Sequence, residues 1–481
     1  MADDGSLGYA QPALDDGSPG RTAIRFASAA ALGGLIFGYD VSVTNGAVAA
    51  LQDEFEIGNA VLGFAAGAGL LGAAAGAIIA GRIADRVGRL SMMRLAAALF
   101  LVCGLGTGLA GGVWMFIGFH GLGGAGIGIA SAIVPAYIAE ISPPRVRGRL
   151  GSLQQLGIVS GIFLALAVDW LPFQFGGGSR GELWLGLAAW RWTFLAEVIP
   201  AVIYGALTFT IPESPRYLIA AQRVPEARRV LSSVLGERNI EITVNRIQET
   251  LRREHPPSWR DLRKPTGGLY GIVWVGLGLA VFQQLVGITV IFYYGSALWQ
   301  AVGFGESSSF AIAVITSVVN VLITLIAIAL IDKVGRRPLL LTGSAGMALM
   351  LATLSVIFAR APIVDGKPHL VGASALLALI AANIFVIAFG VSWGPGLWVL
   401  LGEIFPNRIR AAAVGLAAAG QWLTNFAIAF TFPALRHMLG FAYGFYTLCA
   451  VLSFLFVWRW VRETNGVSLE DMHAELLRDG K

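Results

Sequence analysis

The chain has 481 residues, of which 56% are hydrophobic and only 13% charged, and its mean hydropathy is +0.71. This composition indicates a membrane protein that crosses the bilayer many times and excludes an ordinary water-soluble domain. The formal charge of +5 does not indicate a nucleic-acid partner, because the basic residues gather in particular loops.

About twelve apolar stretches have the length of roughly 20 residues that a membrane-spanning helix needs. They start near residues 22, 59, 90, 113, 150, 188, 267, 309, 337, 370, 409 and 439. A transmembrane barrel is excluded, because its strands would read as segments of about ten alternating residues and these runs are continuous. The sequence therefore predicts an all-α, polytopic fold.

The loops differ in charge. Arginine and lysine gather after spans 2, 4, 8 and 10, whereas the loop after span 1 carries Asp53, Glu54 and Glu56. This bias predicts that both termini lie in the cytoplasm of a cell-membrane protein. The acidic residues 1–21 lack the pattern of a secretory signal, and Cys103 and Cys449 fall within spans, so we expect no disulfide framework.

The first span, GGLIFGYDVSVTNGAV, contains Asp40. An acid at membrane depth is a candidate functional group, and burial favours its neutral form, so Asp40 could load and release a proton. The alternative is a neutral carboxyl that caps a local kink. Glu197 in span 6 is a second such acid, and His120 in span 4 is either a titrating group or a hydrogen-bonded core imidazole.

The chain contains an internal duplication. The segment GRIADRVGRL (81–90) matches LIDKVGRRPL (330–339) at an offset of 247, and AEISPPRVRG matches GEIFPNRIRA at an offset of 263. Two matches at similar offsets predict six spans followed by six. Halves of this kind enclose a binding site at their interface near the middle of the bilayer.

Acidic and basic residues at the cytoplasmic ends of the spans form a predicted charge latch. Carboxylates and guanidinium groups can pair across the two bundles in one conformation and separate in another. The alternative is that they only set the topology. The latch candidates are Asp85, Arg86, Arg89, Glu140, Arg147, Glu213, Asp332, Arg336, Glu403 and Arg410.

The stretch FQQLVGITVIFYYG (282–295) places two amides in an apolar run. Gln283 and Gln284 would be costly against lipid, so they must face protein or water. On a regular helix, Thr289 would lie roughly 120° from Gln283, but Gly287 and the β-branched residues after it predict a break. The amides either bind a neutral, hydroxyl-rich solute or bond one helix to another.

Span 10, VSWGPGLWVLLGEIF, predicts a second helix break at Gly394, Pro395 and Gly396. The faces of Trp393 and Trp398 beside it suit a sugar ring, although such residues also serve packing. Residues 213–266 turn polar and form a cytoplasmic linker. No phosphate loop, metal-ligand spacing or nucleophile elbow is present, so we expect neither an enzyme, nor a cofactor, nor a metal site.

Seven motifs in order resemble the sugar porter family of the major facilitator superfamily, with the closest likeness to bacterial members that take glucose or xylose. The motifs are GRIADRVGR, PAYIAEISPPRVRG, PESPRYL, QQLVGITVIFYYG, DKVGRRPLLLTG, GPGLWVLLGEIFP and RETNGVSLE. The resemblance runs from Gly33 to about Met472. It implies a site between the two halves and a rocking, alternating-access cycle.

The resemblance also implies roles for single residues. The sugar-binding positions are Gln155, Gln283, Gln284, Thr289, Asn320, Phe389, Trp398 and Gln421. Tyr293 and Tyr294 fall where the family closes its outer gate, and Asp40 matches the acid of proton-coupled members. Three positions depart from the family: Thr289 replaces an asparagine, His120 replaces an arginine that pairs with the acid, and Arg462 replaces the proline of the terminal PET motif.

Together these observations predict a twelve-helix symporter that moves a monosaccharide with a proton, the proton being its co-substrate. The expected parts are residues 1–21 (tail), 22–212 (first bundle), 213–266 (linker), 267–461 (second bundle) and 462–481 (tail). We expect a monomer whose partners are a monosaccharide and the lipid bilayer. A facilitative uniporter and a sugar sensor without transport activity remain the alternatives.

Overall fold

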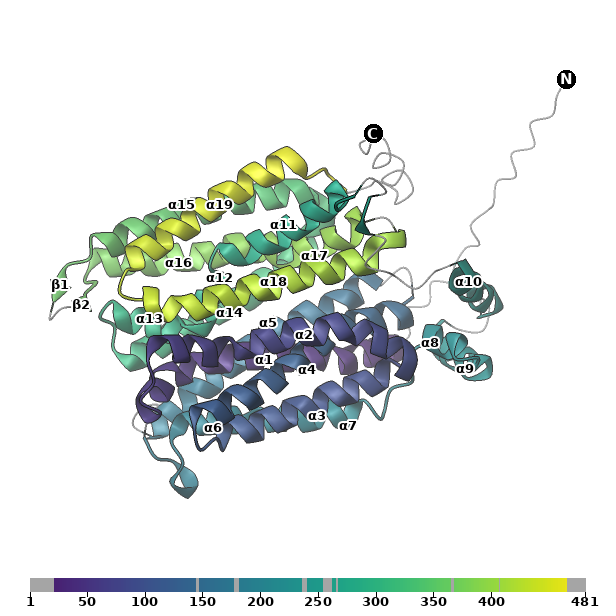
Figure 1. Ribbon diagram of the computed structural model, residues 1–481, viewed down its shortest axis with the longest axis horizontal. Coiled ribbons are helices and arrows are strands. Elements are labelled where there is room, and N and C mark those ends of the chain that lie inside the picture. Colours follow the sequence, from purple (N-terminus) through teal and green to yellow (C-terminus); the bar gives the residue numbers. More distant parts are fainter. Residues whose placement is uncertain are drawn as a thin grey trace.

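The computed structural model describes residues 21–143, 147–176, 181–235, 240–253, 262–264, 267–364, 367–405 and 407–464. These residues fold almost entirely into helices (Figure 1). The only sheet among these residues has two strands of two residues each, β1 (Ile363–Val364) and β2 (Lys367–Pro368). The all-α prediction is confirmed.

The first half of the chain forms one group of helices. Its members are α1 (Arg21–Glu54), α2 (Asn59–Val87), α3 (Arg89–Gly108), α4 (Val113–Ile141), α5 (Arg147–Gly176), α6 (Ala189–Ala196) and α7 (Val198–Leu207), with a short 3-10 turn, η1 (Trp184–Gly186). Helices α6 and α7 are separated by the single residue Glu197 and together make the sixth span.

The second half forms the other group, which lies beside the first in Figure 1. Its members are α11 (Gly271–Leu285), α12 (Ile288–Tyr293), α13 (Gly295–Ala301), α14 (Glu306–Val334), α15 (Arg336–Ala359), α16 (Ala373–Val391), α17 (Trp393–Ile404), α18 (Asn407–Leu435) and α19 (Leu439–Trp460). The described residues contain 11 segments long and apolar enough to span a membrane, and α6 with α7 adds the twelfth. The predicted number of spans is confirmed.

Three linker helices, α8 (Pro215–Ala220), α9 (Val224–Leu235) and α10 (Ile240–Arg253), lie outside the bundle (Figure 1). They bury a small core of their own around Leu218, Leu231 and Val244. We call the end of the bundle that carries these helices the linker end. The opposite end, which carries the β1–β2 hairpin and α13, is the far end.

Small residues set the spacing of the helices. Gly76 and Gly124 on α2 and α4 face the backbone of the opposite helix so closely that neither position has room for a Cβ. Tight backbone contact of this kind is how helices associate in a membrane, where water does not drive them together. The two halves touch chiefly through α2 with α18 and α5 with α14.

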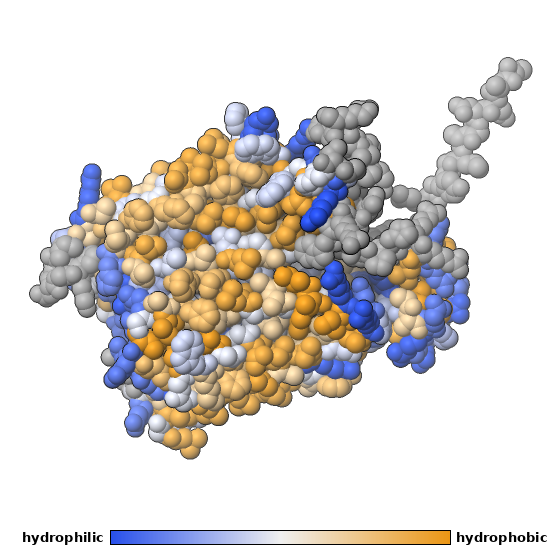
Figure 2. Space-filling model, in the orientation of Figure 1, coloured by the Kyte–Doolittle hydropathy of each residue, from blue (hydrophilic) through white to orange (hydrophobic). Residues whose placement is uncertain are grey.

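The outer surface has the pattern of a membrane protein. Apolar side chains cover the middle of the face seen in Figure 2, and hydrophilic side chains gather at its two ends. Large apolar residues such as Leu349, Leu376 and Leu448 are more than half exposed. A belt of this size would be unfavourable in water, so lipid covers it.

Candidate functional site

A break in the chain between α11 and α12 positions the first part of the site. Gly287 has φ +80°, in the left-handed region that favours glycine, and it directly precedes α12. On an unbroken helix, the side chains of Gln284 and Thr289 would diverge by roughly 140°. After the break, Thr289 Oγ1 lies 3.0 Å from Gln284 Oε1. The predicted break at Gly287 is confirmed.

Five polar side chains from three helices meet at this break. We call them the amide cluster: Gln283, Gln284, Thr289, Gln421 and Asn425. Gln283 donates to the Trp393 carbonyl at 2.7 Å and accepts from Gln421 Nε2 at 2.7 Å. Gln284 Nε2 donates to Gln283 Oε1 at 3.3 Å, and Thr289 Oγ1 lies 2.7 Å from Asn425 Oδ1.

The amide cluster has the chemistry of a polyol site. Its members are 3 to 7% exposed, and most of their hydrogen bonds join one side chain to another. Gln421 Oε1 has no hydrogen-bond partner in the part of the chain that the structure describes. Because an amide donates and accepts, hydroxyl groups of a ligand can replace these mutual bonds. The amides also bond one helix to another, which was the alternative interpretation, because the cluster joins α11, α12 and α18 and donates to a carbonyl of α17.

The remaining predicted binding residues lie on other helices. Gln155 is half-buried on α5, and Asn320 is 7% exposed on α14, the helix that packs against α5 across the two halves. Within the described part of the chain, the Asn320 amide has no hydrogen-bond partner. Phe389 is half-buried on α16, and Trp398 on α17 is 37% exposed.

The second predicted break is wrong in position. The chain breaks at Ser392, between α16 and α17, and Gly394, Pro395 and Gly396 lie in the first turn of α17. The reason is that proline fits the first turn of a helix, where its missing N–H has no partner to lose. Trp393 is fully buried and donates to Leu340 O and Ser344 Oγ, so it packs the core.

A pair of buried carboxyls forms the second part of the site. Asp40 on α1 and Glu197 between α6 and α7 are both 0% exposed, and their oxygens and Cys103 Sγ lie within 4.8 Å of one another. Cys103 donates to Asp40 Oδ1 at 3.4 Å, and neither Glu197 oxygen accepts a hydrogen bond from any residue that the structure describes. Two carboxyls this close cannot both be ionised, so the pair retains a proton. These three side chains also form the one group of the described residues whose spacing could hold a metal ion.

His120 lies beside this pair but bonds elsewhere. Its Nδ1 is 2.9 Å from the Ala65 carbonyl, and its ring lies 5.5 Å from that of Phe116. A carbonyl only accepts, so Nδ1 carries the hydrogen. The imidazole is close enough to interact electrostatically with Asp40, yet the direct hydrogen bond to Asp40 comes from Cys103.

At the linker end, the latch candidates pair within each half. Arg89 forms a bidentate pair with Glu140 at 3.1 Å and a second pair with Asp85 at 3.1 Å. Glu213 accepts from the backbone N–H groups of Arg89 and Leu90 at the start of α3. In this structure these residues pair within the first half, and pairing across the two bundles in another conformation stays a prediction.

The second half repeats this arrangement. Arg336 pairs with Glu403 at 2.9 Å, and Glu463 accepts from the backbone N–H groups of Arg336 and Arg337 at 3.0 Å each. Arg410 donates instead to the Phe405 carbonyl. Arg86 is exposed, and the side chains of Arg147 and Asp332 lie outside the described residues. Gly88 and Gly335, both with φ +94°, turn the chain ahead of the two duplicated arginines.

The far end is closed by contacts between the halves. Asn45 on α1 donates to the Phe292 carbonyl at 3.0 Å and accepts from the Ser296 N–H at 3.0 Å. Ser296 Oγ donates to the Asn45 carbonyl at 2.7 Å, and Arg436 donates to Gln52 Oε1 at 3.0 Å. These bonds hold α13 against α1.

The predicted gate tyrosines lie at the same junction. Tyr293 ends α12, and Tyr294 is the break between α12 and α13. Both are buried, and Tyr294 donates to the Ala429 carbonyl on α18 at 2.7 Å. Tyr294 therefore bonds within the second half, while Asn45 makes the bond between the halves.

Two residues of the site, Asn45 and Asp169, were missed from the sequence, and Asn425 was noted in span 11 but given no role. Each is a polar side chain in an apolar run, the same signal that identified Asp40. Asp169 on α5 is 3% exposed and accepts from the Gly46 N–H of α1 at 3.1 Å. Its position in the run LALAVDWL could have marked it as a further intramembrane acid.

Twelve spans in two duplicated halves, with polar side chains buried among them, define a secondary transporter of the major facilitator fold. Comparison with known proteins gives the family. A profile described as "Sugar (and other) transporter" matches residues 26–476, and the chain belongs to this sugar transporter family.

Curated relatives and solved structures agree with this family. The chain is 52% identical over 446 residues to the glucose transport protein of Synechocystis, covering 92% of this chain and 95% of that protein. It is 34% identical over 485 residues to the D-xylose-proton symporter of Escherichia coli K12, covering 92% and 94%. The partially occluded inward-open structure of the E. coli xylose transporter superposes with a TM-score of 0.80 at 32% identity, covering 93% of this chain and 100% of that one.

Proposed function

We propose that this protein is a proton-coupled symporter that carries a monosaccharide, a hexose such as glucose or a pentose such as xylose, across a cell membrane by alternating access. Both termini lie in the cytoplasm, the proton is the co-substrate, and the working unit is a monomer without cofactor or enzymatic activity. The amide cluster carries the substrate proposal, because its mutual hydrogen bonds can be exchanged for those of sugar hydroxyls.

The coupling proposal is supported by the Asp40–Glu197 pair. A proton taken up by the pair removes a buried charge, and its release restores one, so the pair's protonation can favour one conformation over another. The closed far end and the likeness to an inward-open relative support an inward-facing assignment for this structure. In this scheme Asn45 moves away from α12 and α13, which carry the gate tyrosines at their junction, when the far end opens.

The test is counterflow in liposomes with a panel of labelled monosaccharides. We expect one or a few hexoses or pentoses to exchange, and uptake of the same sugar to depend on an imposed proton gradient. No exchange of any monosaccharide would refute the transport proposal. Gradient-independent uptake would establish the uniporter, which the bond of His120 to Ala65 favours, because His120 offers Asp40 no fixed cation.

A further inference from the structure

Asp169 is a buried carboxyl that the proposed mechanism does not use. One of its oxygens accepts from the Gly46 N–H of α1 at 3.1 Å, and the other, Oδ1, has no hydrogen-bond partner within the described ranges of the chain. A Cβ on Gly46 would lie 2.6 Å from Asp169 Cγ, so the glycine permits this close approach. The carboxyl therefore lies directly against α1.

Among the residues that the structure describes, no cation pairs with Asp169. The titratable and charged groups in the far-end part of the helices packed against α5 are Tyr39, Asp40, Asp53, Glu54, His120, Arg191 and Glu306, with Glu197 between α6 and α7. Arg191 is committed to Glu54 at 2.5 Å and to the Gly108 and Ala110 carbonyls. A lone carboxylate at membrane depth is costly, so Asp169 holds a proton in this conformation and can ionise once water reaches it.

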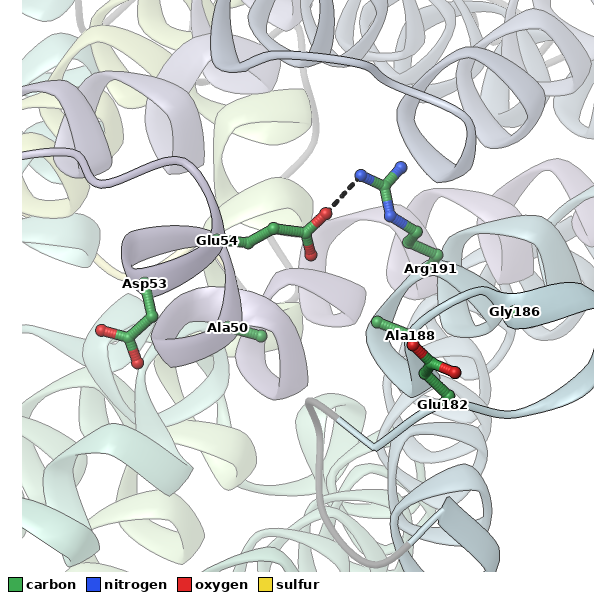
Figure 3. A pocket seen from close by; sticks show the side chains of 7 residues that line it. All are labelled: Ala50, Asp53, Glu54, Glu182, Gly186, Ala188 and Arg191. Atoms are coloured by element: carbon green, nitrogen blue, oxygen red, sulfur yellow. Dashed lines mark hydrogen bonds and ion pairs between the residues drawn. The ribbon is translucent and has the colours of Figure 1, made fainter.

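Asp169 lies between the Asp40–Glu197 pair and the far-end surface. Gly46 follows Asp40 by six residues, about 9 Å along α1 at the helical rise of 1.5 Å per residue. One turn further, Ala50 lines a pocket of about 420 Å³ that opens toward solvent. Asp53, Glu54 and Glu182 line the same pocket together with Arg191 (Figure 3), so carboxylates outnumber guanidinium groups there, and an excess of acidic groups attracts protons.

Hydrogen bonds link α1 to α6 between Tyr39 and the pocket. The Tyr39 hydroxyl donates to the Thr193 carbonyl at 2.7 Å. The Thr193 hydroxyl donates to the Trp190 carbonyl at 2.7 Å. Trp190 in turn donates to the pocket residue Glu54 at 2.6 Å.

We propose that Asp169 is a second proton-binding carboxyl of the transporter, which passes protons between the acid-lined pocket at the far end and the Asp40–Glu197 pair. The step is a proton transfer only: a pocket water or carboxyl gives up a proton, the Asp169 carboxylate takes it, and the pair receives it later. The inference rests on the proposed proton coupling. It places the proton's path along α1 and α5, apart from the amide cluster on α11, α12 and α18.

The experiment compares Asp169→Asn and Asp169→Glu with the wild type in liposomes. Asparagine keeps an oxygen for the Gly46 N–H but cannot carry a proton, whereas glutamate keeps the titratable group. We expect Asp169→Asn to lower the initial rate of proton-driven uptake at least tenfold between pH 5.5 and 8, with counterflow within twofold of wild type. Asp169→Glu should restore proton-driven uptake. Ser42→Ala, which removes another buried group without a partner, is the control and should behave as wild type.

Two results would overturn the inference. Wild-type rates of proton-driven uptake in Asp169→Asn would show that the carboxyl carries no proton, and equal loss of counterflow in the asparagine and glutamate variants would make it structural. Failure of the proposed function looks different: the wild type itself would then move no protons when sugar is added, as read by a pH dye inside the liposomes.

Discussion

Replacement of Gln283 by alanine tests whether the amide cluster binds sugar. Gln283 makes three side-chain hydrogen bonds, to the Trp393 carbonyl, Gln421 and Gln284. If a sugar takes over two of them, Gln283→Ala removes about 2 kcal/mol of binding at roughly 1 kcal/mol per neutral hydrogen bond. That loss corresponds to a rise of about 30-fold in the half-saturation constant for counterflow.

The same variant has a distinct outcome if the amides only join helices. A dry cluster would then lose partners for Trp393 O and Gln421 Nε2, at about 1–3 kcal/mol for each, and the melting temperature in detergent would fall. Asn383→Ala is the matched control, because its amide donates only to Leu379 O of its own helix. A half-saturation constant within threefold of wild type, together with a lower melting temperature, would refute the binding role.

Three further variants test the coupling, the closed far end and the duplicated turn. Asp40→Asn should abolish accumulation against a gradient and leave counterflow, and uphill uptake at the wild-type rate would exclude coupling through Asp40. Asn45→Ala removes two hydrogen bonds to α12 and α13, about 2 kcal/mol, and should favour the open far end. To detect this opening, Ala313→Cys on the neighbouring α14 is labelled with an impermeant thiol reagent. Labelling should be faster when Asn45→Ala is also present, and an unchanged rate would count against a role of Asn45 in closing the far end. Gly335→Ala should lower stability by about 1–3 kcal/mol, because φ +94° strains any side chain. Its melting temperature should fall below that of Gly402→Ala, a helical glycine with open space around it, and equal melting would contradict the strain argument.

The residue types next to Gly287 were enough to predict the helix break there. The same reasoning put the break of span 10 at Gly394, Pro395 and Gly396, a few residues after its position at Ser392. A glycine followed by four β-branched residues disfavours a helix at that point whatever surrounds it. Pro395, by contrast, is compatible with either a break or a helix start, and only the packing of α17 selects the second.

Partner choice could not be predicted from sequence. The duplicated motifs located Arg89 and Glu140, and their equivalents Arg336 and Glu403, but spacing along the chain does not say whether a carboxylate faces its own half or the other. In the same way, nothing local marks Asn425 as the neighbour of Thr289, since 136 residues separate them and only the fold joins α12 to α18.

The side-chain amide of Asn45 bonds two backbone groups that could instead bond to each other. The two groups it bridges, the Phe292 carbonyl and the Ser296 N–H, are four residues apart, which is the spacing of an ordinary helical hydrogen bond. If the hydrogen bonds to Asn45 break, these two groups can bond to each other, and α12 and α13 can then form one continuous helix. Separation of the halves at this point can therefore replace the hydrogen bonds to Asn45 with one backbone hydrogen bond. The Phe292 carbonyl and the Ser296 N–H would then keep a partner within the membrane.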